Sequence, residues 1–338
     1  MPKTAIVILN WNTRNHLETF LPFLVKYSSG PDIQIVIADN ASTDDSVPFL
    51  KTNYPDITLL LLDKNYGFAE GYNKALQQVK AEYYILLNSD IEVTENWIQP
   101  LIGLLESSPE IAVTMPKLLS YYKRNYFEYA GAAGGYIDKF GYPFCKGRIF
   151  WTMEKDEGQY DGVNEIFWAT GACLAIKSEI FHNTGGFDPY FFAHQEEIDL
   201  CWRLHHQGYK IYCNTQSVAY HLGGGTLPKS NPYKTYLNIR NNHVLLYKNL
   251  SHKQWVKIFM ARIPLDLIAA LKFLLGSQPA EFWAVFKAHF NFYQYLLKSK
   301  KEPRPAHTSS HLIFQGSIIY QYLFLKKKKF SDIKFKFH

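Results

Sequence analysis

The stretch Tyr83-Tyr-Ile-Leu-Leu-Asn-Ser-Asp90 joins an apolar run to three polar residues at its carboxyl end. A short apolar run that ends in turn-forming residues is typical of a buried β-strand. Similar runs occur at 5–9, 33–38, 58–62 and 111–116, and amphipathic stretches separate them. Strands that alternate with helices build a mostly parallel sheet, because each helix returns the chain to the start of the next strand. The first 120 residues therefore predict an α/β fold.

Polar residues stand directly after most of these strands: Asn10, Asp39 with Asn40, Asp63, and Asn88 to Asp90. In an open α/β sheet the carboxyl ends of the strands line the ligand crevice. Asp39 can accept a hydrogen bond from the imide of a nucleobase there, whereas helix capping accounts for Ser42 or Thr43. The stretch Asn65-Tyr-Gly67-Phe-Ala-Glu-Gly71-Tyr-Asn73 adds amides and glycines at another strand-to-helix turn. We therefore expect a binding site at this edge.

Asp90 and Asn88 together resemble half of a metal site. A carboxylate and an amide are hard ligands, and Mg²⁺ or Mn²⁺ completes such a set with substrate phosphates and water. The alternative is a solvated Asp90 that caps the next helix. His221 follows another apolar run and precedes Gly223-Gly-Gly225, where a ligand can approach closely. A lone histidine is more often structural, but with Asp90 it predicts a second metal ligand.

Three carboxylates begin the predicted helix Glu196-Glu-Ile-Asp-Leu-Cys-Trp-Arg203. The helix dipole tolerates acidic residues in this first turn, and Asp199 can pair with Arg203 at i,i+4. Glu196 and Glu197 point about 100° apart on a helix. One of them can therefore face the crevice as a general base while the other is solvated.

The rest of the chain divides into regions of different character. Residues 121–165 predict loops with short strands, either a lid or an insertion on the acceptor side. Beyond them the pattern predicts strands at 166–176, 209–213 and 217–221 and a helix at 196–206. Ser251 and Gln254 form a capping box for a further helix, and Pro264 begins or kinks the next one. We expect one domain over 1–248, a helical extension over 249–300 and a basic tail over 301–338.

Charge is concentrated at the carboxyl end. The chain has 338 residues and a net charge of +6, and residues 301–338 alone carry eight basic and two acidic side chains. The neutral body argues against a nucleic-acid-binding protein and for a basic anchor. Hydrophobic residues make up 47%, which excludes a disordered chain. The four cysteines form no CxxC pair, which suggests a reducing compartment, and no signal peptide or transmembrane run is evident.

Two apolar stripes follow residue 255 at helical spacing. They comprise Met260, Ile263, Leu267, Ala270, Leu271 and Leu274, and then Trp283, Phe286, Phe290, Tyr293 and Leu297. An apolar face beside basic residues is typical of a helix that lies on an anionic membrane. The alternatives are packing against the main domain and a homodimer contact.

The motifs described above also occur in a known order. They are 7–12, Asp39-Asn-Ala-Ser-Thr-Asp44, Asn65-Tyr-Gly-Phe-Ala69, Leu87-Asn-Ser-Asp90, Thr170-Gly-Ala-Cys173, Gly185-Gly-Phe-Asp188, Glu196-Glu-Ile-Asp-Leu200 and His221-Leu-Gly-Gly-Gly225. From about residue 4 to 245 the chain is similar to family 2 glycosyltransferases, close to the rhamnosyltransferase-like branch of bacterial polysaccharide assembly. The resemblance implies the GT-A fold, a Rossmann-like and mostly parallel sheet flanked by helices, here with a C-terminal helical extension.

The resemblance also implies roles for individual residues. Asp39 would bind the base, Asp90 and His221 a divalent cation at the diphosphate, and Glu197 would be the catalytic base. The donor-binding set would be Asn10, Asp39, Asn65, Gly67, Asn88, Asp90 and Gly171, with Glu196, Asp199 and Arg203 on the acceptor side or in support. The usual Asp-x-Asp reads Asn88-Ser-Asp90 here, so Asn88 adds no charge and is expected to contact ribose or sugar. The usual Glu-Asp reads Glu196-Glu197, which gives the base a longer reach.

The expected function is inverting, metal-dependent transfer of a sugar from a nucleotide-diphosphate donor to a hydroxyl of a lipid-linked or polysaccharide acceptor. The enzyme would work in the cytoplasm, on the inner face of the cell membrane. Two alternatives stay open: a non-catalytic subunit that binds nucleotide sugar, and a sugar nucleotidyltransferase. The second is disfavoured because the chain has no Gly-rich pyrophosphate loop.

Overall fold

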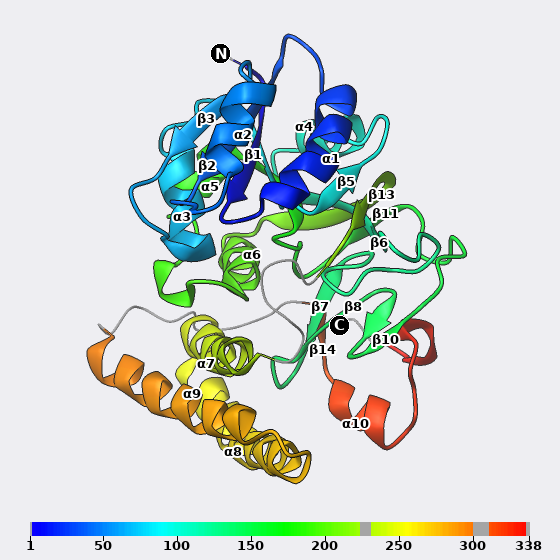
Figure 1. The fold of residues 1–338 in the computed structure, drawn as a ribbon. Helices are drawn as coiled ribbons and strands as arrows, with labels where there is room; N and C mark the ends of the chain where they lie inside the picture. Colours follow the sequence, from blue (N-terminus) through cyan, green and yellow to red (C-terminus); the bar gives the residue numbers. More distant parts are fainter. Residues whose placement is uncertain (1, 224–230, 300–310, 336–338) are drawn as a thin grey trace.

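A nine-stranded sheet forms the centre of the computed structural model, which describes residues 2–223, 231–299 and 311–335 (Figure 1). The strand order is β11-β13-β6-β12-β4-β1-β2-β3, and β5 pairs with β13. The strands are β1 (Thr4–Asn10), β2 (Ile33–Asp39), β3 (Thr58–Leu61), β4 (Tyr83–Leu87), β5 (Ile91–Val93), β6 (Ile111–Ser120), β11 (Val163–Glu165), β12 (Cys173–Lys177) and β13 (Lys210–His221).

The first five predicted strands are confirmed as β1, β2, β3, β4 and β6. β1 pairs in parallel with β2 and β4, and β2 pairs in parallel with β3. In this register Asn10 lies opposite Asp39. The two polar residues that end β1 and β2 therefore stand side by side at one edge of the sheet.

The prediction of one strand over 166–176 is wrong. Only its second half forms β12, which runs antiparallel to both β4 and β6. The first half makes a single bridge from Trp168 to Gly135 and then turns at Gly171, where the Ala172 amide donates to Thr170 Oγ1 at 3.2 Å. An apolar run does not reveal such a turn, because the residues on both sides of it are buried.

The predicted strands at 209–213 and 217–221 are one strand, β13. It pairs in parallel with β6, and its register shifts between Asn214 and Val218. Ser217, within the irregularity, is fully buried and donates to the Trp97 carbonyl at 2.6 Å. The polar residues that suggested a gap are thus accommodated by a bulge inside the strand.

Helices cover both faces of the sheet. They are α1 (Arg14–Tyr27), α2 (Ser46–Asn53), α3 (Gly67–Leu76), α4 (Gln99–Ser107), α5 (Ser178–Asn183) and α6 (Glu196–His206), the last as predicted. Side chains of β1 alternate between two cores: Ile6 and Ile8 pack with α1 and α4, whereas Val7 packs with α3 and α6. This period of two is the signature of a strand buried on both faces.

Residues 121–165 form the loops and short strands that the sequence predicts. Most of these strands belong to a second, five-stranded sheet within the described residues, in the order β10-β9-β8-β7-β14. Its strands are β7 (Gly135–Asp138), β8 (Pro143–Cys145), β9 (Arg148–Ile149), β10 (Thr152–Met153) and β14 (Ile313–Phe314). β14 pairs in parallel with β7, and the Phe330 amide donates to Glu154 Oε1 at 2.8 Å. The second half of the expected basic tail is therefore packed structure that includes α10 (Ile318–Leu323), while Lys301, Arg304 and Lys336 lie outside the described residues.

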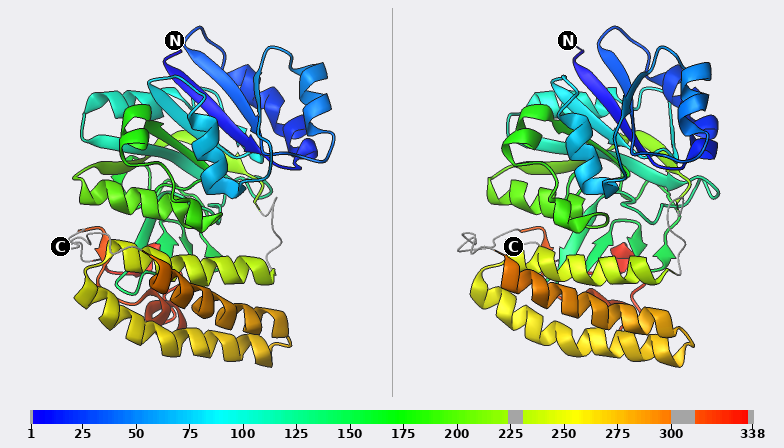
Figure 2. Two further views of the ribbon diagram at one scale, coloured as in Figure 1. Left: turned by 90° about the vertical axis from the view of Figure 1, so that its left-hand side faces the viewer. Right: turned by 60° about the vertical axis from the view of Figure 1, so that its left-hand side comes forward.

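Three long helices form a layer on the side away from the N-terminus (Figure 2). They are α7 (Pro232–Asn249), α8 (His252–Leu275) and α9 (Pro279–Lys298), and α7 lies between the α/β body and the other two. The predicted capping box of Ser251 and Gln254 is confirmed at the start of α8. Pro264 lies inside α8 and begins no new helix. The division of the chain near residue 249 stays a prediction.

Two further properties bear on the environment of the protein. Among the residues that the structure describes, no helix combines the length and the apolar character that a bilayer crossing requires. The cysteines Cys145, Cys173, Cys201 and Cys213 are free and buried.

Candidate active site

Asn10 and Asp39 form one half of a polar network at the carboxyl ends of β1 and β2. Asn10 Nδ2 donates to Asp39 Oδ1 at 2.8 Å and to Ser42 Oγ at 3.1 Å, and the Ser42 amide donates to Asp39 Oδ2 at 2.9 Å. Asn10 and Asp39 are both almost fully buried. Asp39 is thus an oriented hydrogen-bond acceptor, held from both sides by its neighbours.

Asn40, Asn65 and Gly67 extend this network to the start of α3. Asn40 Nδ2 donates to Asn65 Oδ1 at 3.1 Å and to the Gly67 carbonyl at 3.0 Å, and the Gly67 amide donates to Asn65 Oδ1 at 2.8 Å. Asn40 was not among the predicted site residues, although it directly follows Asp39. The network therefore joins four of the predicted donor-binding residues: Asn10 and Asp39, and then, through Asn40, Asn65 and Gly67.

Gly67 is required where a loop approaches α3. Its φ is +73°, and a Cβ there would lie 2.8 Å from the Phe192 carbonyl oxygen. That carbonyl accepts from the amides of Phe68 and Ala69, at 2.7 and 3.1 Å. Gly67 therefore shapes the turn and is covered by Phe192.

Asp90 and His221 lie together, as two ligands of one cation must. β5 pairs with β13 beside them, and the Leu222 amide donates to the Asp90 carbonyl at 3.0 Å. His221 Nε2 lies 3.2 Å from Asp90 Oδ1. Two ligands about 2.1 Å from one ion and at right angles to each other lie about 3 Å apart, so this donor set fits a divalent cation. Asp90 is buried, and it precedes a strand and not the helix that the alternative interpretation needs.

Glu128 is a third member of this cluster, and no sequence motif indicates it because it lies in the irregular segment between β6 and β7. Its Oε2 lies 3.0 Å from His221 Nδ1. Burial alone would raise the pKa of Asp90, but His221 lowers it below its ordinary value. Burial alone would lower the pKa of His221, but Asp90 and Glu128 raise it well above its ordinary value. The three groups thus form a strongly coupled buried ion pair network.

Asn88 and Gly171 connect the end of β4 with α6. The Asn88 amide donates to the Ala172 carbonyl at 2.9 Å. A Cβ on the adjacent Gly171 would lie 3.8 Å from the Cβ of Glu197 and 3.2 Å from the Phe68 ring. The end of β4 and the first turn of α6 therefore meet at the turn around Gly171.

Glu196 is buried, and Glu197 is half-buried. Each has a buried Oε2 with no hydrogen-bond partner among the described residues. Burial raises the pKa of Glu197 to about 7. Burial and the neighbouring Glu197 raise the pKa of Glu196 well above its ordinary value. The expectation that one of the two glutamates is solvated while the other faces the crevice is wrong. α7 and the loop before α6 cover this turn (Figure 2), so that Glu196 is only 4% exposed.

Asp199 and Arg203 support α6. Arg203 Nε donates to Asp199 Oδ2 at 2.8 Å, as their i,i+4 spacing predicts. Lys248 and Asn249 of α7 also donate to the Asp199 carboxylate, both at 2.9 Å. The charge of Asp199 is therefore fully paired, and it ties α6 to α7.

The loop 190–195, which leads into α6, is held by polar residues of α7. Phe192, His194 and Gln195 have φ angles of +63°, +71° and +71°, a region that is unfavourable for residues with a Cβ. Asn241 Nδ2 donates to the carbonyls of Phe191, Ala193 and His194 at 2.7 to 3.0 Å. Asn241, which the sequence did not single out, thus compensates for the unfavourable backbone and fixes the start of α6.

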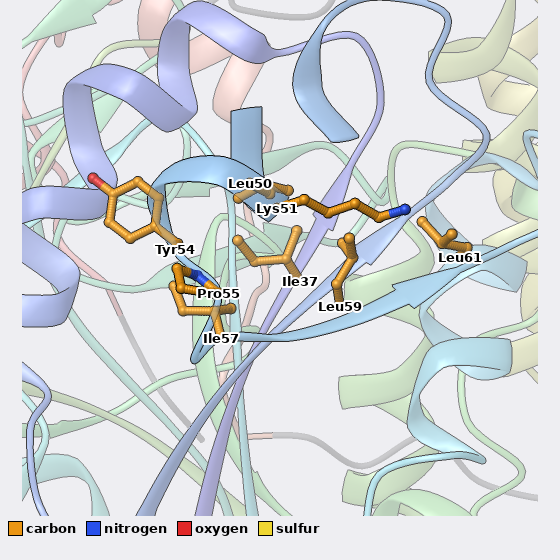
Figure 3. A pocket seen from close by; sticks show the side chains of 8 residues that line it. All are labelled: Ile37, Leu50, Lys51, Tyr54, Pro55, Ile57, Leu59 and Leu61. Atoms are coloured by element: carbon orange, nitrogen blue, oxygen red, sulfur yellow. The ribbon is translucent and has the colours of Figure 1, made fainter. Parts of the chain in front are cut away.

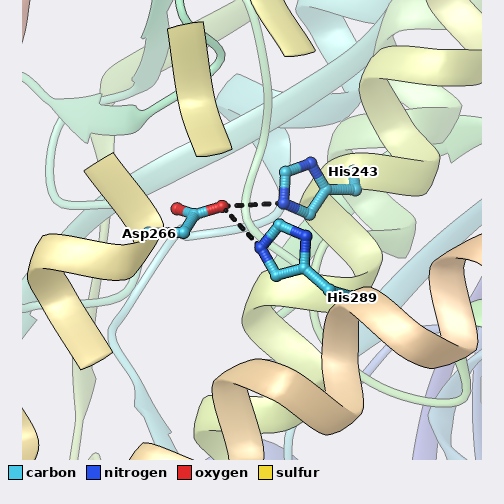
Figure 4. A group of neighbouring side chains, drawn as sticks. All are labelled: His243, Asp266 and His289. Atoms are coloured by element: carbon cyan, nitrogen blue, oxygen red, sulfur yellow. Dashed lines mark hydrogen bonds and ion pairs between the residues drawn. The ribbon is translucent and has the colours of Figure 1, made fainter. Parts of the chain in front are cut away.

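A second group of potential metal ligands lies between the three long helices (Figure 4). Within the described parts of the chain, His243, Asp266 and His289 are the one group of three or more His, Cys, Asp or Glu side chains close enough to share a metal ion. The Nε2 atoms of His243 and His289 lie 2.8 and 3.2 Å from Asp266 Oδ2. Arg262 lies 3.4 Å from the other oxygen and already supplies the positive charge that a metal ion would bring. The cluster holds α7, α8 and α9 together.

An apolar hollow on the outer side of the sheet is unrelated to these polar clusters (Figure 3). It is lined by Ile37, Leu50, Lys51, Tyr54, Pro55, Ile57, Leu59 and Leu61. Of the described residues that line it, Lys51 alone carries a charge. The described residues of this lining include no carboxylate, imidazole or thiol that could bind a cation.

Comparison with known proteins agrees with this geometry. The N-acetylglucosaminyl-diphospho-decaprenol L-rhamnosyltransferase of Mycobacterium tuberculosis is 24% identical over 237 residues, which cover 65% of this chain and 76% of that protein. The O-antigen biosynthesis protein RfbC of Myxococcus xanthus is 25% identical over 228 residues, which cover 65% of this chain but 17% of that protein.

Solved structures show the same fold at low identity. GalNAc-T7 with UDP, GalNAc and Mn²⁺ aligns with a TM-score of 0.58 and 16% identity, over 75% of this chain and 49% of that one. S. aureus TarS 1-349 in complex with UDP-GlcNAc aligns with a TM-score of 0.55 and 15% identity, over 86% of this chain and 81% of that one. These are GT-A glycosyltransferases, so the predicted fold class is confirmed.

The family assignment comes from the sequence of the α/β body. The model of the family described as glycosyl transferase family 2 matches residues 5–184, which is more than half of the 338 residues. The match spans β1 to β4 and the polar residues that end them. With a GT-A fold, a crevice edge built from Asn10, Asp39 and Asp90, and this match, the chain belongs to glycosyl transferase family 2.

Proposed function

We propose that the protein is an inverting, metal-dependent glycosyltransferase of cell-surface glycan synthesis. It would transfer a sugar from a nucleotide-diphosphate donor to a hydroxyl of a lipid-linked or polysaccharide acceptor. The observation that carries this proposal is an arrangement of side chains: His221 Nε2 lies 3.2 Å from Asp90 Oδ1, and Glu197, with its buried Oε2, lies beside Gly171. The names of the rhamnosyltransferase and O-antigen relatives support the acceptor class.

Each part of the site has a task in this reaction. Asp39 would accept from the nucleobase, and Asn10 and Ser42 hold its carboxylate for that contact. Asp90 and His221 would hold Mg²⁺ or Mn²⁺, which neutralises the charge that builds on the departing diphosphate. Glu197 would take the proton from the acceptor hydroxyl as its oxygen attacks the anomeric carbon and the bond to the diphosphate breaks. One displacement of this kind inverts the anomeric configuration.

Release of nucleoside diphosphate from a nucleotide sugar tests the enzyme hypothesis. Purified protein is screened with a panel of nucleotide sugars and Mn²⁺ by thermal shift, and the donor with the largest shift is then incubated with the protein. We expect slow release of diphosphate that EDTA abolishes. A donor that binds and stabilises the protein without any turnover, with or without acceptor extract, would support the non-catalytic alternative.

The outer face of α8 and α9 suggests where the enzyme works. The predicted stripes are largely exposed: Met260 62%, Leu267 47%, Trp283 64%, Phe290 61% and Leu297 87%. The acidic residues of these helices, Asp266 and Glu281, are buried, whereas the lysines at 253, 257, 272, 287 and 298 are exposed. The described helices therefore present an apolar surface with basic and no acidic side chains.

The C-terminal residues extend this surface. Lys272 of α8 lies 5.4 Å from the centre of the Trp151 ring, and Trp151 contacts Tyr322 of α10. Phe324, directly after α10, is 70% exposed and precedes the four lysines 326–329. We propose that α8, α9 and α10 lie on the inner leaflet of the cell membrane and hold the crevice near a lipid-linked acceptor.

Flotation with liposomes tests this contact. We expect binding to anionic vesicles that falls with salt, since each basic residue near the surface contributes about 1 kcal/mol and screening weakens it. Replacing Trp283 and Phe290 with Ser should lower the bound fraction about tenfold or more, because their burial in lipid is lost. The control is Tyr122→Ser, which changes an aromatic residue that is 77% exposed outside these helices. The proposal fails if the protein floats with neither anionic nor neutral vesicles. A dimer in light scattering that the double variant disrupts would then show that the face binds a second copy instead.

A further inference from the structure

Glu128 lies at the metal-binding cluster and has no role in the mechanism described above. Its side chain is 9% exposed, and Oε2 lies 3.0 Å from His221 Nδ1. The same oxygen accepts from the Ala130 amide. The carboxylate is thus fixed from its own loop and directed at the ring of His221.

Gly223 shows that room has been left for this carboxylate. Its φ is +72°, and a Cβ there would lie 2.8 Å from Glu128 Oε1. Any larger residue would press on the Glu128 side chain and would also be strained by its backbone angle. Gly223, two residues after His221, therefore allows the close approach of Glu128 to the histidine ring.

The ring of His221 is placed between two carboxylates on opposite sides. Nε2 faces Asp90 and Nδ1 faces Glu128. An imidazole binds a cation through one nitrogen while the other keeps its proton, and the acceptor of that proton decides which nitrogen is free. Nδ1 makes no hydrogen bond to the described residues, but Glu128 Oε2, 3.0 Å away, is placed to accept its proton once His221 is a neutral ligand. Nε2 is then left to the cation beside Asp90. Glu128 itself is on the wrong side of the ring to bind the same ion.

We propose that Glu128 is a positioning residue that orients His221 and fixes its Nδ1 proton, so that Nε2 binds the divalent cation. This proposal rests on the cation site proposed for Asp90 and His221. Partners of this kind to a metal-bound histidine typically change metal affinity 10- to 100-fold when they are replaced.

Mn²⁺ affinity measured by electron paramagnetic resonance tests the proposal. The probe is Mn²⁺ with whichever of UDP, GDP or dTDP gives the largest Mn²⁺-dependent thermal shift. Glu128→Gln should weaken Mn²⁺ binding 10- to 100-fold. The affinity of this variant for the same nucleotide in the presence of EDTA, and its melting temperature, should change little. Gly223→Ala, which displaces the carboxylate without removing it, should weaken Mn²⁺ binding in the same selective way.

Glu154→Gln is the matched control. Glu154 is a buried carboxylate of the same segment, 5% exposed, and it accepts from Tyr160 and Phe330 at 2.9 and 2.8 Å. Its replacement should leave Mn²⁺ affinity unchanged. Equal Mn²⁺ binding by Glu128→Gln and the unaltered protein, or a parallel loss of nucleotide affinity in EDTA, would overturn the role of Glu128. If the unaltered protein itself binds no Mn²⁺ with any of the nucleotides, the proposed cation site fails instead.

Discussion

Glu197→Gln is expected to lower turnover by about 10²- to 10⁴-fold while donor affinity is retained. The amide keeps the size of the side chain but cannot take a proton from the acceptor hydroxyl. Glu197 lies in the first turn of α6 beside Gly171, whereas Asp39, the residue expected to bind the nucleobase, is held by Asn10 and Ser42. Steady-state kinetics with the identified donor, together with donor titration by calorimetry, separates the two effects.

Glu196→Gln is the control for this substitution. Burial and the neighbouring Glu197 raise the pKa of Glu196 well above its ordinary value, which favours the neutral form of its carboxyl group. Glutamine resembles a neutral carboxylic acid, and we expect turnover to change only a few-fold. If Glu196→Gln proves the more damaging change, the base is Glu196 and the assignment is off by one residue.

The pH dependence follows from the same carboxylate. A general base works in its deprotonated form, and burial raises the pKa of Glu197 to about 7. Activity should therefore fall as the pH drops below about 7 and reach a plateau above it. The Glu197→Gln variant should lose this acid limb, because its remaining activity no longer depends on that proton.

Asp90→Ala is expected to lower transfer on the order of 10³-fold, since a metal ion supplies several kcal/mol of charge stabilisation and each 1.36 kcal/mol is tenfold in rate. His221 alone supplies a single ligand, which is too few to hold the cation in competition with water. The fold should persist, because His221 keeps its ion pair with Glu128 at 3.0 Å. Activity assays, Mn²⁺ binding with nucleotide and thermal melting check the three statements.

The unaltered protein gives the reference for this experiment. With two protein ligands, it should bind Mn²⁺ weakly alone and tightly with nucleoside diphosphate, because phosphate oxygens complete the set. Undiminished transfer by Asp90→Ala, or tight Mn²⁺ binding without nucleotide, would contradict the assignment.

The sequence predicts the parallel half of the fold because that information is local. Each strand is a short apolar run, and the polar residue at its end marks the crevice, so Asn10, Asp39 and Asp90 could be named in advance. The turn at Gly171 could not, because buried turns and buried strands have the same composition. The pairing of β14 with β7 joins residues far apart in the chain, and no local pattern encodes it.

The site residues that the sequence missed act through partners from distant segments. Glu128 is a single carboxylate in an irregular loop, and its importance comes only from the approach of His221. Asn241 lies within a polar run of α7, where two adjacent asparagines in the middle of a helix are the one unusual signal. Its role depends on the loop 190–195, almost fifty residues earlier.

Asn241 holds the loop 190–195 through the backbone of the loop, which leaves side chains of the loop free to differ between related enzymes. Its amide contacts the carbonyl groups of Phe191, Ala193 and His194, which every amino acid carries. A substitution of Ala193 can therefore alter the surface of the loop without loosening it, whereas the φ of +71° restricts which residues can replace His194. Among relatives that accept different glycans, we expect position 193 to vary while the asparagine at 241 is invariant.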